Sequence, residues 1–224
     1  MEEKYWDTLF SDIKICLEKA NIALPSVSLI ALKYNKNAFC ILLATIISLR
    51  TKDKITLESS IRLFSLGTSA EKIATLNPKT IEKAIYPCAF YKKKTQTIIN
   101  ISKILIEKYN STVPNISKEL LQLPGVGIKT ANLTLNLAFD IEAICVDCHV
   151  HQIANRIGWI KTQTPEESEK ALQKIMPKKY WICLNEMLVS FGQYICTPIN
   201  PKCNICPIDN KCKKINVKTK NQAF

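Results

Sequence analysis

Apolar residues recur every three or four positions along almost the whole chain, and no segment alternates between apolar and polar residues as a half-buried strand would. A first amphipathic helix is predicted from five such residues: Trp6, Leu9, Phe10, Ile13 and Leu17. The run 39–49 is apolar on nearly every side, which is typical of a helix at the centre of a domain. The pattern therefore predicts an all-α protein of roughly ten helices joined by short loops.

Several polar residues stand directly before helix-forming segments and are expected to cap them. Asn77 is followed by a proline, which favours the first helical position. Thr164 is followed three residues later by a glutamate, which completes a capping box. Ser117 is expected to cap a short helix, and Asp147 is expected to cap a helix over 148–157.

A helix–hairpin–helix is predicted around the run Leu-Pro-Gly-Val-Gly-Ile-Lys-Thr-Ala-Asn, residues 123–132. Its two helices are expected over 117–123 and 128–138. Gly125 and Gly127 permit a tight turn and let backbone N–H groups approach a ligand closely. Those groups lie at the start of a helix, where unpaired donors and the positive end of the helix dipole attract a phosphate.

Lys129 falls in the first turn of the second helix, where a positive charge is disfavoured and the neutral amine is favoured. A neutral lysine beside a bound phosphodiester is a nucleophile that can attack a sugar. The run therefore favours DNA chemistry. The alternative is a simple turn followed by a solvated surface lysine.

Charge and hydropathy indicate the kind of binding partner and the cellular location of the protein. The 224 residues include 31 Lys and Arg against 19 Asp and Glu, and the formal net charge of +12 suits a polyanionic partner through counterion release. Charge alone does not identify DNA, because a lysine-rich proteome gives the same excess. No apolar run is long enough to cross a membrane, and the first residues show no signal-peptide pattern. We therefore expect a cytoplasmic protein associated with the nucleoid.

Ten cysteines in such a chain are expected to be free thiols or metal ligands rather than disulfides. Four of them follow the spacing C-x6-C-x2-C-x5-C: Cys196, Cys203, Cys206 and Cys212. Soft thiolate ligands indicate zinc or an iron–sulfur cluster. Because zinc modules usually pair two C-x2-C knuckles and this run has one, the spacing favours a single [4Fe–4S] cluster, with zinc as the alternative. Most of the other cysteines, Cys148 included, are expected to pack in the interior.

Three motifs together resemble the endonuclease III family, the helix–hairpin–helix DNA glycosylases that carry an iron–sulfur cluster. The motifs are Leu123–Asn132, Val146–Val150 and the four C-terminal cysteines, in the family's order and spacing. The resemblance implies two helical lobes with a DNA cleft between them and a C-terminal [4Fe–4S] cluster loop.

The resemblance also implies where the lobes begin and end. A six-helix lobe is expected over 31–141, with the helix–hairpin–helix at about 117–138. Residues 1–30 and 142–212 are expected to form a second, discontinuous lobe that carries the cluster at 196–212. The basic residues 213–224 are expected to form a flexible tail.

The activity that the resemblance implies is that of a bifunctional DNA glycosylase and abasic-site lyase of base excision repair. Lys129 matches the family's catalytic lysine, which attacks C1′ and cleaves the strand by β-elimination through a Schiff base. Asp147 matches the catalytic aspartate, which stabilises charge on the sugar, and an ordinary helix cap is a compatible alternative. The expected substrate is double-stranded DNA with damaged pyrimidines or abasic sites, bound by a monomer.

DNA contacts are expected from a further set of residues: Gly125, Val126, Gly127, Arg50, Phe90, Thr130 and His149. Arg50 occupies the position where many family members place a glutamine that fills the gap left by the flipped base. Phe90 matches the family's second, apolar wedge, and the alternative for it is a core aromatic. His149 is expected to be structural or to face a phosphate rather than to bind a metal.

Two other functions stay open at the level of sequence. The first is a monofunctional mismatch glycosylase of the same superfamily, and such enzymes typically lack the hairpin lysine. The second is a non-catalytic DNA-binding or redox module that uses the cluster for electron transfer. The presence of both Lys129 and Asp147 favours the bifunctional enzyme over either.

Overall fold

The computed structural model describes residues 2–217. All regular secondary structure within these residues is helical, and loops and turns join the helices. These residues divide into two compact units, one over Pro25–Ala143 and one formed by the chain through Leu24 and from Ile144 onward. The predicted all-α class is confirmed. Within the described range, no helix is long and apolar enough to cross a membrane.

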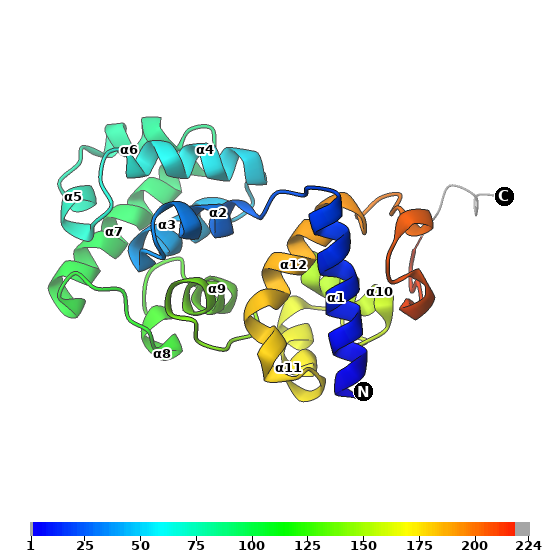
Figure 1. Ribbon diagram of the computed structural model, residues 1–224. Coiled ribbons are helices and arrows are strands. Elements are labelled where there is room, and N and C mark those ends of the chain that lie inside the picture. Colours follow the sequence, from blue (N-terminus) through cyan, green and yellow to red (C-terminus); the bar gives the residue numbers. More distant parts are fainter. Residues whose placement is uncertain (1, 218–224) are drawn as a thin grey trace. The chain divides into compact units, whose positions relative to one another are not determined.

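The unit Pro25–Ala143 is organised around one buried helix (Figure 1). Its helices are α2 (Ser26–Lys33), α3 (Ala38–Ser48), α4 (Asp53–Phe64), α5 (Ala70–Ala74), α6 (Pro78–Ile85), α7 (Tyr91–Tyr109), α8 (Ser117–Leu120) and α9 (Ile128–Phe139). Every residue of α3 from Phe39 to Ile47 is buried, and the helix packs against α2, α4, α7 and α9. The apolar run therefore forms the predicted central helix, because no face of it meets water.

The second unit joins the N-terminal helix to the C-terminal part of the chain. Its helices are α1 (Glu3–Lys19), α10 (Cys148–Ile157), α11 (Pro165–Ile175) and α12 (Trp181–Tyr194), with short 3₁₀ turns at Lys178–Tyr180, Cys203–Ile205 and Asp209–Lys211. Aromatic side chains pack α1 against the rest of this unit. The ring centroids of Trp6 and Trp159 are 4.8 Å apart, and those of Phe10 and Tyr180 are 4.3 Å apart. The predicted amphipathic first helix is confirmed, since its apolar stripe forms this core.

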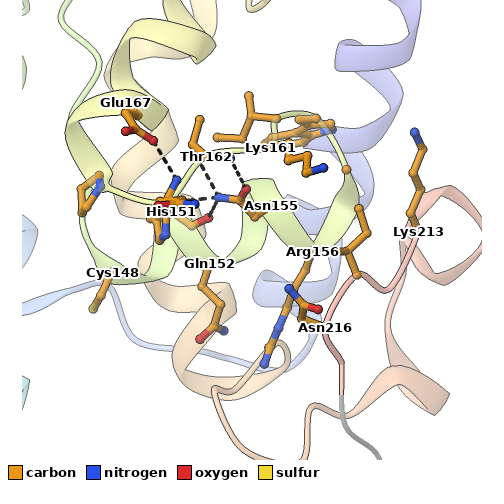
Figure 2. A pocket seen from close by; sticks show the side chains of 16 residues that line it. Cys148, His151, Gln152, Asn155, Arg156, Lys161, Thr162, Glu167, Lys213 and Asn216 are labelled. Atoms are coloured by element: carbon orange, nitrogen blue, oxygen red, sulfur yellow. Dashed lines mark hydrogen bonds between the residues drawn. The ribbon is translucent and has the colours of Figure 1, made fainter.

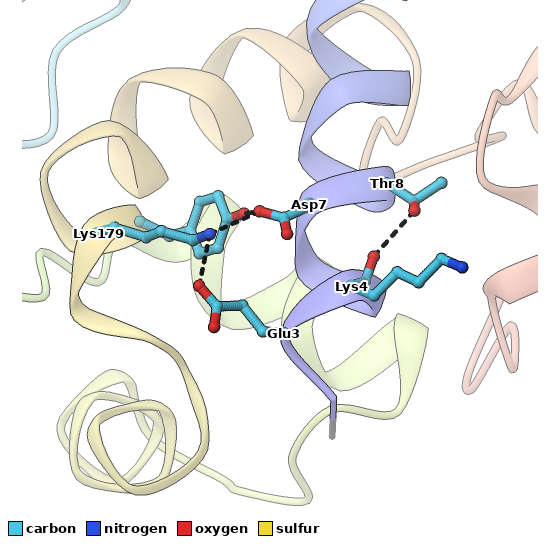
Figure 3. Close-up of polar contacts among 6 residues, drawn as sticks. Glu3, Lys4, Asp7, Thr8 and Lys179 are labelled. Atoms are coloured by element: carbon cyan, nitrogen blue, oxygen red, sulfur yellow. Dashed lines mark hydrogen bonds and ion pairs between the residues drawn. The ribbon is translucent and has the colours of Figure 1, made fainter.

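Lys179 adds polar contacts between α1 and the turn before α12 (Figure 3). Its Nζ lies 2.7 Å from a carboxylate oxygen of Glu3 and 2.7 Å from one of Asp7. The hydrogen bond from Lys179 holds the pKa of Asp7 below its usual value. All three side chains are well exposed, so these pairs orient α1 more than they stabilise the fold.

The caps predicted at Asn77 and Thr164 are confirmed. The Asn77 side chain accepts the N–H of Lys79, and the Thr164 hydroxyl accepts the N–H of Glu167. The capping box closes one residue earlier than predicted, because the Glu167 carboxylate accepts the N–H of Gln163, at 2.8 Å.

The cap predicted at Ser117 is wrong. Ser117 is the first residue of α8, and Ile116 stands before it without a capping side chain. The helix α8 has only four residues and no side-chain cap. The buried side chain of Leu120 anchors it instead.

Part of the expected C-terminal tail is attached to the second unit. The N–H groups of Lys213 and Ile215 donate to the carbonyls of Ile157 and Arg156 at the end of α10. Residues 218–224, the rest of that segment, lie outside the described residues.

Candidate functional site

The hairpin uses its two glycines for different purposes. Gly125 has φ +74°, a backbone conformation that favours glycine, and a Cβ there would lie in a tight contact, 3.0 Å from Cγ2 of Thr97. Gly127 has φ −99°, and a Cβ there would meet no atom within 4 Å. The space beside Gly127 is therefore open to a ligand at the start of α9.

Lys129 is the second residue of α9 and is half-buried. Gly127 stands at the N-cap position and supplies no capping side chain to the first turn. The predicted helix start is confirmed, and Lys129 lies where a bound phosphate would meet the positive end of the helix dipole.

Two predicted DNA contacts lie inside the protein. Val126 is buried in the hairpin, and Thr130 is 1% exposed in α9. Their side chains are buried in the unit, and the expectation of DNA contacts at these two positions stays a prediction. Contacts from these two positions would have to use the backbone.

Arg50 and Phe90 form an exposed pair near the hairpin. Arg50 follows the end of α3, Phe90 directly precedes α7, and both have left-handed backbones, with φ +56° and +58°. The Arg50 guanidinium carbon lies 5.1 Å from the centre of the Phe90 ring. Phe90 is 57% exposed, so the alternative of a core aromatic is wrong.

The pair borders a mostly apolar cavity of about 290 Å³. Thr97 of α7, Gly125 of the hairpin and the buried Lys94 also line it. The unit Pro25–Ala143 thus brings the two predicted wedges and the hairpin to one cavity.

Asp147 caps α10 as predicted. Its Oδ1 accepts the N–H groups of His149 and Val150, both at 2.9 Å, and the residue is buried. These two bonds fix the direction of the carboxylate.

His149 is half-buried against α12. Its Nδ1 is buried without a hydrogen-bond partner, and a Cβ added at Gly192 would lie 2.5 Å from it. Gly192 therefore makes room for the imidazole. The expectation that His149 is structural or faces a phosphate stays a prediction.

A wide groove runs along α10 (Figure 2). Ser168 forms hydrogen bonds with both His151 and Thr162. Asn155 also bonds to Thr162, as Figure 2 shows, so the loop after α10 is held against the helix. Cys148 lies exposed in this groove, which corrects the prediction that it packs in the interior. As the first residue of α10, Cys148 points away from the stripe that the helix buries.

The four C-terminal cysteines line one recess together with apolar side chains of α10 and α12. Burial raises the pKa of Cys206 to about 12 and also raises the pKa of Cys196. A cation is therefore needed to hold thiolates in this recess.

Arg156 is buried, lines the same recess and was not predicted as a site residue. Its guanidinium donates to Sγ of Cys196 at 3.5 Å and to the carbonyls of Thr197 and Pro198 at 2.8 Å each. The N–H of Lys214 donates to Sγ of Cys212 at 3.3 Å. Hydrogen bonds of this kind tune and orient metal-bound sulfur.

Comparison with known proteins identifies the family. The model of the HhH-GPD superfamily of base excision DNA repair proteins matches residues 43–178. Endonuclease III of Thermotoga maritima is 43% identical over 175 residues, which cover 78% of this chain and 82% of that protein. The chain belongs to the endonuclease III family. Endonuclease III of Rickettsia felis is 39% identical over 181 residues, covering 81% of this chain and 85% of that one.

A solved structure of the endonuclease III family supports the same assignment. The trapped covalent intermediate of endonuclease III with DNA, an estranged-adenine complex, matches with a TM-score of 0.80 and 28% identity, covering 96% of this chain and 97% of that chain. This member of the family is a DNA glycosylase and abasic-site lyase of base excision repair. The family generally carries a [4Fe–4S] cluster.

Proposed function

We propose that Lys129 is the nucleophile and Asp147 the charge-stabilising carboxylate in the excision of oxidised pyrimidines from double-stranded DNA. The observation that carries the proposal is the start of α9, where Lys129 lies two residues after Gly127 and the space beside that glycine is open. A phosphodiester bound to this turn would bring a sugar within reach of the Lys129 amine. The likeness to a covalent endonuclease III–DNA intermediate supports this role.

The proposed reaction has two steps, base excision and strand cleavage. The Lys129 amine attacks C1′ of the flipped nucleotide, and the base leaves with the electron pair of the glycosidic bond and the proton that the amine gives up. The C1′–O4′ bond then opens, O4′ takes a proton from water, and the sugar is held as a protonated Schiff base. Loss of a proton from C2′ then expels the 3′ phosphate by β-elimination. Asp147 stabilises the positive charge that develops on the sugar, and its two N–H bonds keep its carboxylate oriented for this.

Arg50 and Phe90 are proposed to enter the duplex beside the flipped nucleotide. Both are exposed, and the apolar ring of Phe90 and the planar Arg50 guanidinium suit a space between stacked bases. Arg50 can donate to O6 and N3 of an orphaned guanine. We therefore expect a mild preference for lesions opposite guanine.

The four cysteines are proposed to hold a [4Fe–4S] cluster. Four thiols share one recess, and two of the sulfur atoms accept N–H bonds. Zinc modules usually pair two C-x2-C knuckles and this run has one, which favours the cluster over zinc. The cluster would brace the basic loop for DNA rather than take part in the reaction.

Borohydride trapping on abasic-site DNA tests the role of Lys129. The native protein should form a covalent adduct, and Lys129→Gln should lose the adduct, base excision and strand cleavage together. DNA affinity should change by no more than about threefold, because one charge among many is removed. Lys103→Gln, which removes an exposed lysine of α7, is the matched control and should keep the adduct. Normal strand cleavage by Lys129→Gln would remove Lys129 from the mechanism.

A further inference from the structure

A buried lysine forms hydrogen bonds with the loop that carries Arg50. Lys94 lies in the first turn of α7 and is 6% exposed. Its Nζ donates to the carbonyls of Ile47 and Leu49, at 2.6 and 2.7 Å, and to Oγ1 of Thr51, at 2.9 Å. An ammonium group has three N–H donors, so all three are used. Burial lowers the pKa of Lys94, and the bonds to three oxygen acceptors favour the charged form against that effect.

Thr51 extends this contact to the loop that carries Phe90. Its Oγ1 accepts the backbone N–H of Ala89 at 3.1 Å as well as the ammonium of Lys94, and donates to the carbonyl of Leu49 at 3.4 Å. A hydroxyl offers one donor and two acceptor sites, so Thr51 uses its full capacity. The network formed by Lys94 and Thr51 leaves none of its own groups unsatisfied.

The network surrounds both wedge residues without touching their side chains. The bonds to Leu49 and Thr51 flank Arg50, and the bond to Ala89 directly precedes Phe90. Arg50 and Phe90 both have left-handed backbones, which are unfavourable for residues other than glycine and persist where the surroundings hold them. The carbonyls of Ile47 and Leu49 lie at the end of α3, where a cation is also favoured by the helix dipole.

We propose that Lys94 and Thr51 are positioning residues that hold Arg50 and Phe90 as one preformed wedge. The proposal rests on the proposed function, because it takes Arg50 and Phe90 to enter the duplex. A wedge fixed before DNA arrives loses little conformational freedom on insertion, so the network should accelerate base flipping. The contribution should be largest where a stacked base must be displaced.

Paired substitutions at Thr51 and Lys94 separate this role from general stability. Thr51→Val keeps the shape and removes the hydroxyl, whereas Thr51→Ser keeps the hydroxyl. Lys94→Met removes the ammonium, and Lys92→Met removes an exposed lysine from the same helix turn as a charge-matched control. Single-turnover rates are measured on a damaged base and on an abasic site, with the thermal midpoint of each variant.

The proposal expects a selective loss of excision. Thr51→Val and Lys94→Met should slow excision by about tenfold, since a small misplacement of a positioning group costs that much or more. Abasic-site cleavage should fall by less than about threefold, because no base must leave the stack. Thr51→Ser and Lys92→Met should stay close to the native protein on both substrates. Equal losses on both substrates, in step with a lower thermal midpoint, would overturn the proposal in favour of a structural role.

A double-mutant cycle with Arg50→Ala shows whether the network acts through the wedge. Thr51→Val should have little further effect on excision once Arg50 is truncated. Additive effects would overturn the positioning role while leaving Arg50 as a wedge. Unchanged excision in Arg50→Ala alone would instead overturn the wedge role of Arg50 itself, and the positioning proposal with it.

Discussion

At the scale of single residues, Asp147 meets two requirements with one carboxylate. Oδ1 accepts two backbone N–H groups at the start of α10, which is the bonding that a helix cap requires. The same bonds restrict the side chain to one orientation, and a charge-stabilising group must be fixed before the reaction begins. The cap and the proposed catalytic role can therefore be separated by changing the charge without changing the cap.

Asp147→Asn should make this separation. Asparagine caps helices about as well as aspartate, so the thermal midpoint should move by less than about 3 °C. The charge is lost, so excision should slow by about a hundredfold in single-turnover assays. Asp147→Ala removes cap and charge, and should also destabilise the fold by about 1 kcal/mol. Full excision by Asp147→Asn would leave this residue as a cap alone.

The roles of some residues could be predicted from the local sequence pattern, and the roles of others could not. The start of the helix at Lys129 followed from two glycines and a helix-forming segment. Lys94 gave no such signal, because it stands among neighbouring lysines and its burial depends on how α7 packs against the end of α3. Arg156 was missed for a similar reason, since the carbonyls it meets are contributed by residues some forty positions later.

At the scale of elements, the hairpin between α8 and α9 shows how one motif combines folding and binding. Gly125 serves the turn, since its φ of +74° strains any other residue and the Thr97 methyl group would crowd a Cβ there. At Gly127 neither the backbone conformation nor the packing calls for glycine. Its φ is one that any residue adopts, and a Cβ there would meet no atom within 4 Å. We infer that the second glycine serves the ligand.

Substitution of the two glycines should therefore have opposite consequences. Gly125→Ala should destabilise the protein by about 1–3 kcal/mol, the cost of a left-handed backbone with crowding, and should lower the thermal midpoint. Gly127→Ala should leave that midpoint nearly unchanged and weaken DNA binding by about tenfold, because a methyl group would stand where the phosphate approaches. Each variant is the control for the other. Gly127→Ala with native affinity would contradict a phosphate site at this turn.

Periodicity predicted the elements better than it predicted their ends. Helical spacing identified α1, and a uniformly apolar run identified α3, because burial of a stripe or of a whole helix leaves a direct trace in the sequence. The cap at Ser117 was wrong because α8 is four residues long and Leu120 positions it by packing. The exposure of Phe90 likewise depends on the turn before α7, which no local pattern reveals.

At the scale of the whole molecule, the cluster loop depends on partners that are distant in sequence. Lys211 bonds to Asp12 of α1 at 2.5 Å, and Arg156 of α10 bonds to the carbonyls of Thr197 and Pro198. Between these contacts the loop is largely polar, with Ile208 as a buried apolar anchor. So small an apolar core cannot order the segment without an additional crosslink. The four cysteines would supply that crosslink through the proposed cluster.

Cys203→Ala should therefore disorder the cluster loop and spare the unit Pro25–Ala143. The purified variant should contain little iron, and its backbone amides should exchange faster over 196–217 and the end of α10, while those of Pro25–Ala143 keep their native protection. DNA binding should weaken strongly, because the loop lysines, among them Lys202 and Lys211, lose their fixed positions. Cys183→Ala, at a half-buried cysteine outside the cluster, should keep both iron and protection. Zinc without acid-labile sulfide in the native protein would refute the cluster, and full iron content in Cys203→Ala would remove Cys203 from its ligands.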